Sequence, residues 1–103
     1  MENSPFSSVA QTVELVTLHG ELDLAVRELL ARQFGEVAAL GRDVLVDMSD
    51  VTYLDSSAIG ALVGLRRELA ERNAGMVLRM SRNAAYRLVE IAGLTTVFDI
   101  ELV

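Results

Sequence analysis

The chain has 103 residues, 51% of them hydrophobic, which is enough for one compact core and too short for two domains. Its formal net charge is -6, and because a nucleic-acid-binding module normally presents the opposite sign to phosphate, we expect no direct nucleic-acid partner. The sequence has no cysteine and a single histidine, which excludes disulfides, thiolate nucleophiles and cysteine-ligated zinc and gives no reason to expect a metal site.

The N-terminal residues 1–10 have the composition of a tail or an edge strand, and we assign the domain to residues 11–103. The N-terminus lacks the basic-then-apolar pattern of a signal peptide. No apolar run approaches the ~18 to 20 residues that a membrane-spanning helix needs. We therefore expect a cytoplasmic protein without membrane contact, and its charge leaves both a monomer and a weak dimer open.

The first half of the domain predicts a strand, a helix and a second strand. Residues 12–18 form an alternating, β-branched run that predicts a strand ending at Gly20. In residues 21–40, apolar side chains recur three or four apart and predict an amphipathic helix, with Asp23 placed to accept from free N–H groups at its start. Residues 43–49 contain a short, nearly continuous apolar run bounded by charge, which is typical of a central strand buried on both faces. The helical stripe consists of Val26, Leu30, Phe34 and Val37, broadened by Leu29 and Leu40.

The second half of the domain continues this alternation. Residues 56–75 predict a second amphipathic helix, residues 76–80 a strand, and residues 81–94 a third helix that Gly93 closes in a left-handed cap. Residues 95–103 are rich in β-forming side chains. The alternation of strands and helices predicts an α/β fold, in which helices pack on a small, mostly parallel sheet of about four or five strands.

An acid and two hydroxyl residues, Asp55, Ser56 and Ser57, stand between the predicted central strand and the second helix. The hydroxyl of Ser56 is therefore expected near unpaired N–H groups and the positive end of the helix dipole, a position that accommodates a phosphate. The simpler interpretation is that Asp55 or Ser56 caps the helix. Capping and regulation do not exclude one another.

Catalysis at this junction is not expected. A serine after a strand suggests a nucleophile elbow, but Leu54 and Ala58 occupy the positions of its glycines, and the only histidine has no visible link to Ser56. No glycine-rich phosphate loop is present. Asp47 and Asp50 flank the central strand, a pairing that suggests magnesium, but acids at the ends of a buried strand are usually solvated and no nucleotide motif accompanies them, so we interpret both as solvated loop ends. We expect neither an enzyme nor a cofactor.

Three segments resemble the STAS domain of bacterial anti-sigma-factor antagonists. They are LHGELD in residues 18–23, VLVDMSDVTYLDSSAIG in residues 44–60 and RLVEIAGLTTVFDI in residues 87–100. The resemblance covers nearly the whole chain, in order and with suitable spacing. Its most specific part is the acid followed by two hydroxyl residues after an apolar strand. The fold that the resemblance implies is a single STAS-like α/β domain.

The resemblance also implies a function and a site. Members of this family are substrates of a serine kinase that is itself the anti-sigma factor. The unphosphorylated antagonist binds the kinase and frees the sigma factor, and phosphorylation of the serine after the acid abolishes binding until a serine phosphatase restores it. By this resemblance Ser56 is the phospho-acceptor, and Asp23, Asp55, Ser57 and Ile59 contribute with it to the partner surface.

Two other functions remain open at this point. A STAS-like subunit without a phosphate cycle serves as a scaffold in a transporter or a stress-sensing assembly, where the Asp-Ser-Ser junction would be a docking point. Binding of a small ligand or nucleotide above the central strand has only fold analogy behind it. One residue departs from the family pattern, because Ala58 stands where glycine is commoner, and we expect it to favour helix and to narrow the space at the kinase contact.

Overall fold

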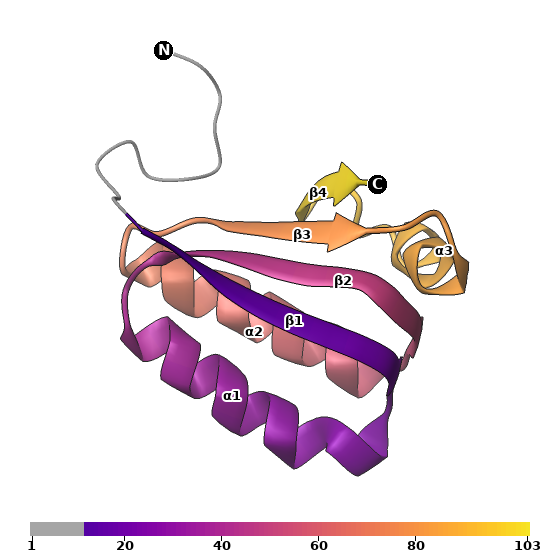
Figure 1. Ribbon diagram of the computed structural model, residues 1–103, viewed down its shortest axis with the longest axis horizontal. Helices are drawn as coiled ribbons and strands as arrows, with labels where there is room; N and C mark the ends of the chain where they lie inside the picture. Colours follow the sequence, from indigo (N-terminus) through magenta and orange to yellow (C-terminus); the bar gives the residue numbers. More distant parts are fainter. Residues whose placement is uncertain (1–11) are drawn as a thin grey trace.

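The computed structural model describes residues 12–103, so the predicted tail or edge at residues 1–10 lies outside the described residues. The strands form one sheet in the order β1-β2-β3-β4, and every neighbouring pair is parallel (Figure 1). The predicted α/β fold with a small parallel sheet is confirmed. The elements are β1 (Val13–Leu22), the 3-10 helix η1 (Leu24–Val26), α1 (Arg27–Ala39), β2 (Asp43–Leu54), α2 (Ser56–Glu71), β3 (Met76–Met80), α3 (Ala84–Ile91) and β4 (Asp99–Leu102).

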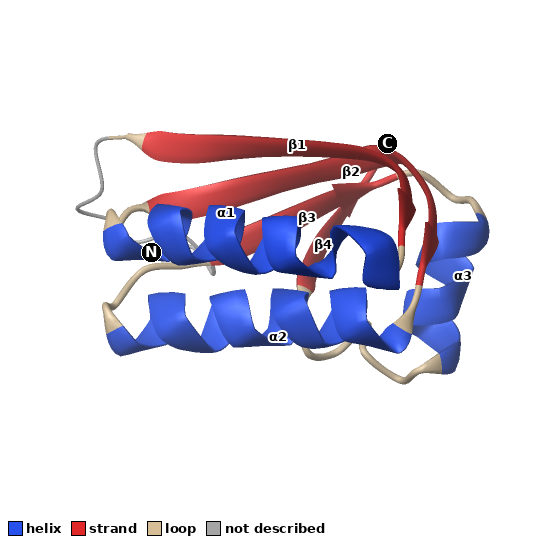
Figure 2. Ribbon diagram, turned by 90° about the horizontal axis from the view of Figure 1, so that it is seen from below, coloured by secondary structure: helices blue, strands red, loops and turns tan. Residues whose placement is uncertain are grey.

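Helices cover one face of the sheet. Figure 2 shows α1 and α2 lying side by side beneath the strands, while α3 lies at the end toward which the strands point. The core fills the space between the sheet and α1 and α2, where Val44, Val46 and Met48 of β2 are fully buried. Leu45 and Asp47 alternate with them and are only half-buried. The prediction that this strand is buried on both faces is therefore wrong, because no described helix covers the second face.

The first two strands are longer than their sequence pattern predicts. β1 does not end at Gly20, which takes a positive φ of 77° and lies at a register shift in the pairing with β2. Beyond this irregularity β1 continues to Leu22, and β2 extends beyond residue 49 to pair Leu54 with it. Bulges of this kind bend a strand and interrupt the alternation from which its length is predicted.

Helix α1 begins later and buries less than predicted. It starts at Arg27, after the single turn of η1. Leu30, Phe34 and Ala38, spaced four residues apart, form its buried stripe. Leu29 and Leu40 are 56% and 50% exposed. The prediction that they broaden the stripe is wrong, because the buried row follows the i, i+4 spacing and α1 is covered on only one side.

The ends of the later helices follow their sequence signals. Gly93 has a positive φ of 75°, and the next residue, Leu94, donates its N–H to the C=O of Val89 at 3.0 Å. The left-handed cap predicted there is confirmed. As the predicted amphipathic pattern requires, α2 buries Leu62 and Leu69, and α3 buries Ala85 and Val89.

Asn83 links the start of α3 to β2. Its Oδ1 accepts from the N–H groups of Ala85 and Tyr86 at 3.1 and 3.2 Å, and its Nδ2 donates to the C=O of Val51 at 2.9 Å. We expect Asn83→Ala to lower the free energy of unfolding by about 2 kcal/mol, because it removes both the cap and a partly buried hydrogen bond. Asn83→Asp keeps the cap and loses only the Nδ2 donor, so the decrease in its free energy of unfolding, measured with urea, should be smaller. Equal losses in the two variants would contradict this assignment.

Candidate functional site

The register of β1 and β2 brings the predicted site residues to one end of the sheet. The two strands pair through Leu22 and Leu54, so the residues that follow, Asp23 and Asp55, leave neighbouring strands side by side. The N–H of Asp55 donates to the C=O of Leu22 at 3.1 Å and ties the two chain segments together. Helix α2 begins directly after this bond, at the carboxyl end of the parallel sheet (Figure 2).

Asp55 is the residue that caps α2. Its backbone is extended, and its Oδ1 accepts from the N–H of Ala58 at 3.0 Å and from the hydroxyl of Ser57 at 2.6 Å. The backbone of Leu24, in the turn after β1, makes a small further contribution that lowers the pKa of this carboxylate. Of the two cap residues that the sequence left open, the structure selects Asp55. Both of these hydrogen bonds lie within the first turn of α2.

These hydrogen bonds, that of the Ser57 hydroxyl first and that of the Ala58 N–H second, lower the pKa of Asp55 below its ordinary value of 3.8 and outweigh the opposing effect of burial. Because the folded-state pKa lies below the unfolded value, the ionised carboxylate stabilises the fold above the unfolded pKa. This contribution is lost as the pH falls through the folded-state pKa.

The lowered pKa of Asp55 predicts how the stability of the fold depends on pH. We expect the Asp55→Asn variant, which cannot ionise, to lose less stability than the wild type on acidification from pH 7 to pH 3. Thermal unfolding followed by circular dichroism at a series of pH values measures the difference. Ser57→Ala removes the largest cause of the shift and should flatten the acid limb in the same direction by a smaller amount. An Asp55→Asn curve parallel to the wild type would contradict the assignment.

The two hydroxyls after Asp55 have different environments. Ser57 is half-buried, and its hydroxyl donates to Asp55. Ser56, the predicted phospho-acceptor, is the first residue of α2 and is exposed. Among residues 12–103, no hydrogen bond involves the hydroxyl of Ser56. Its oxygen is accessible to another protein, whereas that of Ser57 is occupied.

The remaining predicted partner residues lie around this junction. Asp23 is half-buried, and its Oδ1 accepts from the N–H of Ala25 at 3.0 Å, so it caps η1 and not α1 as the sequence predicts. Ile59 is partly buried against the core, which leaves only part of its side chain for a partner. Ala58 is 2% exposed. The expectation that Ala58 narrows the partner contact is wrong, because the cap by Asp55 orients this position of the helix toward the core.

Two exposed apolar side chains at the same end were not selected from the sequence. Leu24 lies in η1, directly after Asp23, and Tyr53 lies in β2, two residues before Asp55. Leu24 lies in the segment predicted as the first helix, and Tyr53 lies in the predicted connection between the central strand and the second helix. Their closeness in sequence to Asp23 and Asp55 is the signal that could have drawn attention to them.

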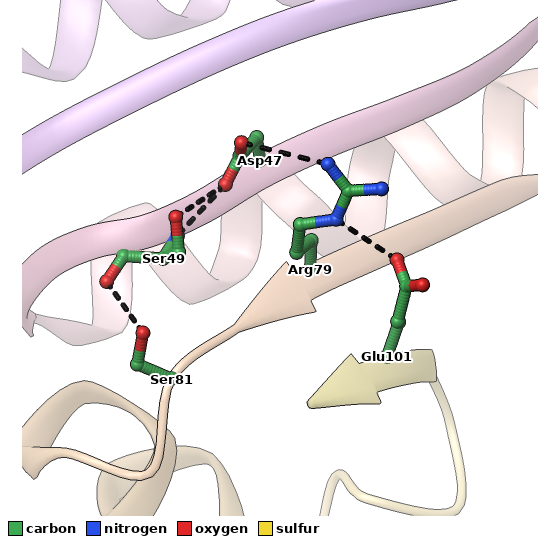
Figure 3. Close-up of polar contacts among 5 residues, drawn as sticks. All are labelled: Asp47, Ser49, Arg79, Ser81 and Glu101. Carbon is green, nitrogen blue, oxygen red and sulfur yellow. Dashed lines mark hydrogen bonds and ion pairs between the residues drawn. The ribbon is translucent and has the colours of Figure 1, made fainter. Parts of the chain in front are cut away.

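A second polar cluster lies on the uncovered face of the sheet (Figure 3). Asp47 Oδ1 accepts from the N–H and the hydroxyl of Ser49 at 3.0 and 2.7 Å, and these bonds, the hydroxyl first, lower the pKa of Asp47. Arg79 lies between Asp47, at 3.8 Å, and Glu101, to which it donates at 2.9 Å. Ser81 donates to the C=O of Ser49 at 2.9 Å. The interpretation of Asp47 as a solvated loop end is wrong, since it lies within β2 and helps to join β2, β3 and β4.

Within residues 12–103, no group of three or more histidine, aspartate or glutamate side chains is placed to hold a metal ion. In this part of the chain, no helix combines the length and the apolar character that crossing a bilayer would require.

Comparison with known proteins identifies the family. The sequence profile of the STAS domain matches residues 7–103. Over 85 residues the chain is 28% identical to the anti-sigma-B factor antagonist of Bacillus subtilis strain 168, which covers 82% of this chain and 78% of that protein.

Two solved structures share the fold. The anti-sigma factor antagonist SpoIIAA in its unphosphorylated form matches with a TM-score of 0.68 at 18% identity, covering 93% of this chain and 84% of that one. The Bacillus cell fate determinant SpoIIAA in the phosphorylated form matches with a TM-score of 0.65 at 19% identity, covering 95% and 88%. Because the family profile matches nearly all of its sequence, this chain belongs to the STAS domain family.

Proposed function

We propose that this chain is an anti-sigma-factor antagonist whose binding is switched by phosphorylation of Ser56. In its unphosphorylated form it binds an anti-sigma factor that is also a serine kinase, and so regulates sigma-factor-dependent transcription. The observation that carries the proposal is the state of Ser56, whose exposed hydroxyl has no hydrogen-bond partner among the described residues and stands at the acidic start of α2. The role of the relatives as anti-sigma factor antagonists supports it.

The electrostatics of the junction support a switch by charge. A phosphoserine carries about -1.5 to -2 charges, and the start of a helix accommodates an anion. Asp55 already accepts from the N–H of Ala58 and from the hydroxyl of Ser57. A phosphate on Ser56 would therefore point outward, next to Asp55 and Asp23. In an interface it would repel an acidic neighbourhood and would have to be desolvated, with little change in the fold.

The proposal includes further partners and a location. A serine phosphatase would remove the phosphate and restore binding, and the cycle would run in the cytoplasm without direct contact to nucleic acid or membrane. The domain itself would perform no catalysis, since the kinase supplies the chemistry. A monomer and a weak dimer are both compatible with such a cycle.

Mass spectrometry of protein recovered from its native cells tests the proposal. Intact-mass and peptide measurements should find one added phosphate, on Ser56, in a fraction that changes between growth and stress. The purified, unphosphorylated chain should also bind the anti-sigma-type kinase encoded in the same genome, as measured by isothermal titration calorimetry. Absence of the phosphate under both conditions would favour a STAS scaffold in a transporter or stress-sensing assembly.

A further inference from the structure

The face of the sheet opposite α1 and α2 carries a row of apolar side chains. Leu15 of β1 pairs with Leu45 of β2, and Leu45 pairs with Val77 of β3, so the three residues lie next to one another across the strands. The residue that follows each of them is buried in the core, and strand alternation therefore directs the three side chains to the open face. Leu15 is 59% exposed, and Leu45 and Val77 are half-buried. These three residues form the apolar row.

The topology of the sheet explains why α1 and α2 do not cover the apolar row. The strands follow one another in chain order, β1-β2-β3-β4, and neighbouring strands are all parallel. Crossovers of one hand that add strands in one direction fall on the same face of a sheet, and Figure 2 shows α1 and α2 together on that face. All-parallel sheets occur almost only with both faces covered. The apolar row therefore indicates a cover that the crossovers of this domain do not supply.

A charged row lies beside the apolar row on the same face (Figure 3). Asp47 follows Leu45 by two residues in β2, and Arg79 follows Val77 by two residues in β3. The carboxylate of Asp47 and the guanidinium of Arg79 are 3.8 Å apart, and Arg79 also donates to Glu101 at 2.9 Å. The side chains of Asp47 and Arg79 both remain partly exposed. On the open face, β2 thus presents an apolar residue followed by an anion, and β3 presents an apolar residue followed by a cation.

We propose that the open faces of two copies of this chain stack on each other in a weak symmetric dimer. The pattern on the face is complementary to itself. A two-fold axis parallel to the strands and midway between β2 and β3 places Leu45 opposite Val77 of the partner copy and Asp47 opposite the partner copy's Arg79. The symmetry forms each of these contacts twice. The apolar rows exclude water between the sheets, and the opposite charges fix how the two sheets are aligned.

The size of the face sets the strength of this dimer. Strands lie about 4.8 Å apart and rise about 3.3 Å per residue, so four strands of roughly five residues outline a face of roughly 300 Å². A stable interface buries about 800 Å² on each partner. The contact is therefore small, and we expect a Kd between about 10 μM and 1 mM.

Sedimentation velocity of the full chain tests the dimer against a matched control. Between about 10 μM and 1 mM the wild-type chain should pass from monomer to dimer. The two-fold axis places Leu15 opposite Asp99 of the partner copy, so Leu15→Glu brings two anions together and should raise the Kd at least about tenfold. Leu29→Glu makes the same change at a side chain that is 56% exposed on α1 and should dimerise as the wild type does. Circular dichroism should show both variants folded.

Charge reversal tests the alignment of the two sheets. Asp47→Arg leaves two cations on the face and Arg79→Asp leaves two anions, so like charges meet in each dimer and neither variant should dimerise alone. In an equimolar mixture, opposite charges meet at both contacts, and the heterodimer should form with a Kd close to that of the wild type. Circular dichroism and urea unfolding of each variant show whether the fold is retained.

Separate results would refute the dimer and its alignment. A wild-type chain that stays monomeric at about 1 mM refutes the dimer and assigns the face to another cover, such as a helix of a different protein. A Leu15→Glu chain that dimerises as tightly as the wild type also refutes it, because the contact must then lie elsewhere. A mixture that is no more dimeric than its two folded components refutes the pairing of Asp47 with Arg79. The phosphate switch stands or falls separately, since the dimer does not use Ser56.

Discussion

Replacing Ser56 with alanine is expected to abolish phosphorylation by the partner kinase completely and to leave binding of that kinase intact. Ser56 is exposed, whereas the hydroxyl of its neighbour Ser57 is held by Asp55 at 2.6 Å. The kinase therefore has one accessible hydroxyl at the junction. Since alanine adds neither bulk nor charge and the Ser56 hydroxyl has no hydrogen-bond partner among the described residues, the Kd should stay within about twofold of the wild-type value, which is less than about 0.5 kcal/mol. Phosphate incorporation from labelled ATP and titration calorimetry measure the two quantities.

The matched control is Ser57→Ala. This variant keeps the accessible hydroxyl of Ser56 and loses a bond to the cap, so it should still be phosphorylated. Phosphate on Ser57 in the Ser56→Ala protein would contradict the difference between the two environments. Loss of kinase binding by Ser56→Ala, with its fold intact, would instead mean that the hydroxyl itself is a required contact.

Much of the fold could be predicted because local signals agree with tertiary packing. The third helix ends where Gly93 adopts the left-handed backbone conformation that a glycine favours. The parallel α/β fold follows from the alternation of strand-type and helix-type hydrophobic patterns along the sequence. The lengths of β1 and β2 could not be predicted, because the positive φ of Gly20 lies within an irregular ladder and not at a strand end. The exposure of Leu29 and Leu40 depends on how much of α1 the sheet covers, which periodicity alone does not determine.

The residues of the candidate site could be chosen from the sequence, whereas their arrangement in space could not. Asp55 and Ser56 follow from residue type and position, since caps and junctions have sequence signatures. Asp23 lies beside Asp55 because Leu22 pairs with Leu54. The register between two strands that are distant in sequence cannot be predicted from the sequence of either strand alone. The inward direction of Ala58 is set by the phase of the helix after its cap. The exposure of Leu24 and Tyr53 likewise depends on how η1 and the end of β2 are placed in the fold.

Phosphorylation of Ser56 is expected to weaken kinase binding by at least about 100-fold, because like charges placed together in an interface cost several kcal/mol and each 1.4 kcal/mol is a factor of ten. The phosphate would join Asp55 and Asp23, and the N–H of Ala58 is already bonded to Asp55. Ser56→Asp adds one negative charge where phosphate adds nearly two, so this variant should also bind the kinase more weakly than the wild type, but by a smaller factor. Titration of the kinase with protein carrying phosphoserine at this position measures the effect.

The neutral variant Ser56→Asn distinguishes charge from size. It is nearly isosteric with Ser56→Asp, so it should bind much more tightly than the aspartate variant if the switch is electrostatic. The difference between the two should narrow as salt rises, because screening acts on charge and not on shape. Near-ultraviolet circular dichroism and the midpoint of urea unfolding should change little in either variant. A phosphorylated chain that unfolds, or that binds the kinase at full strength, would rule out local electrostatics, since the acidic neighbourhood of Ser56 acts only on a folded and charged site.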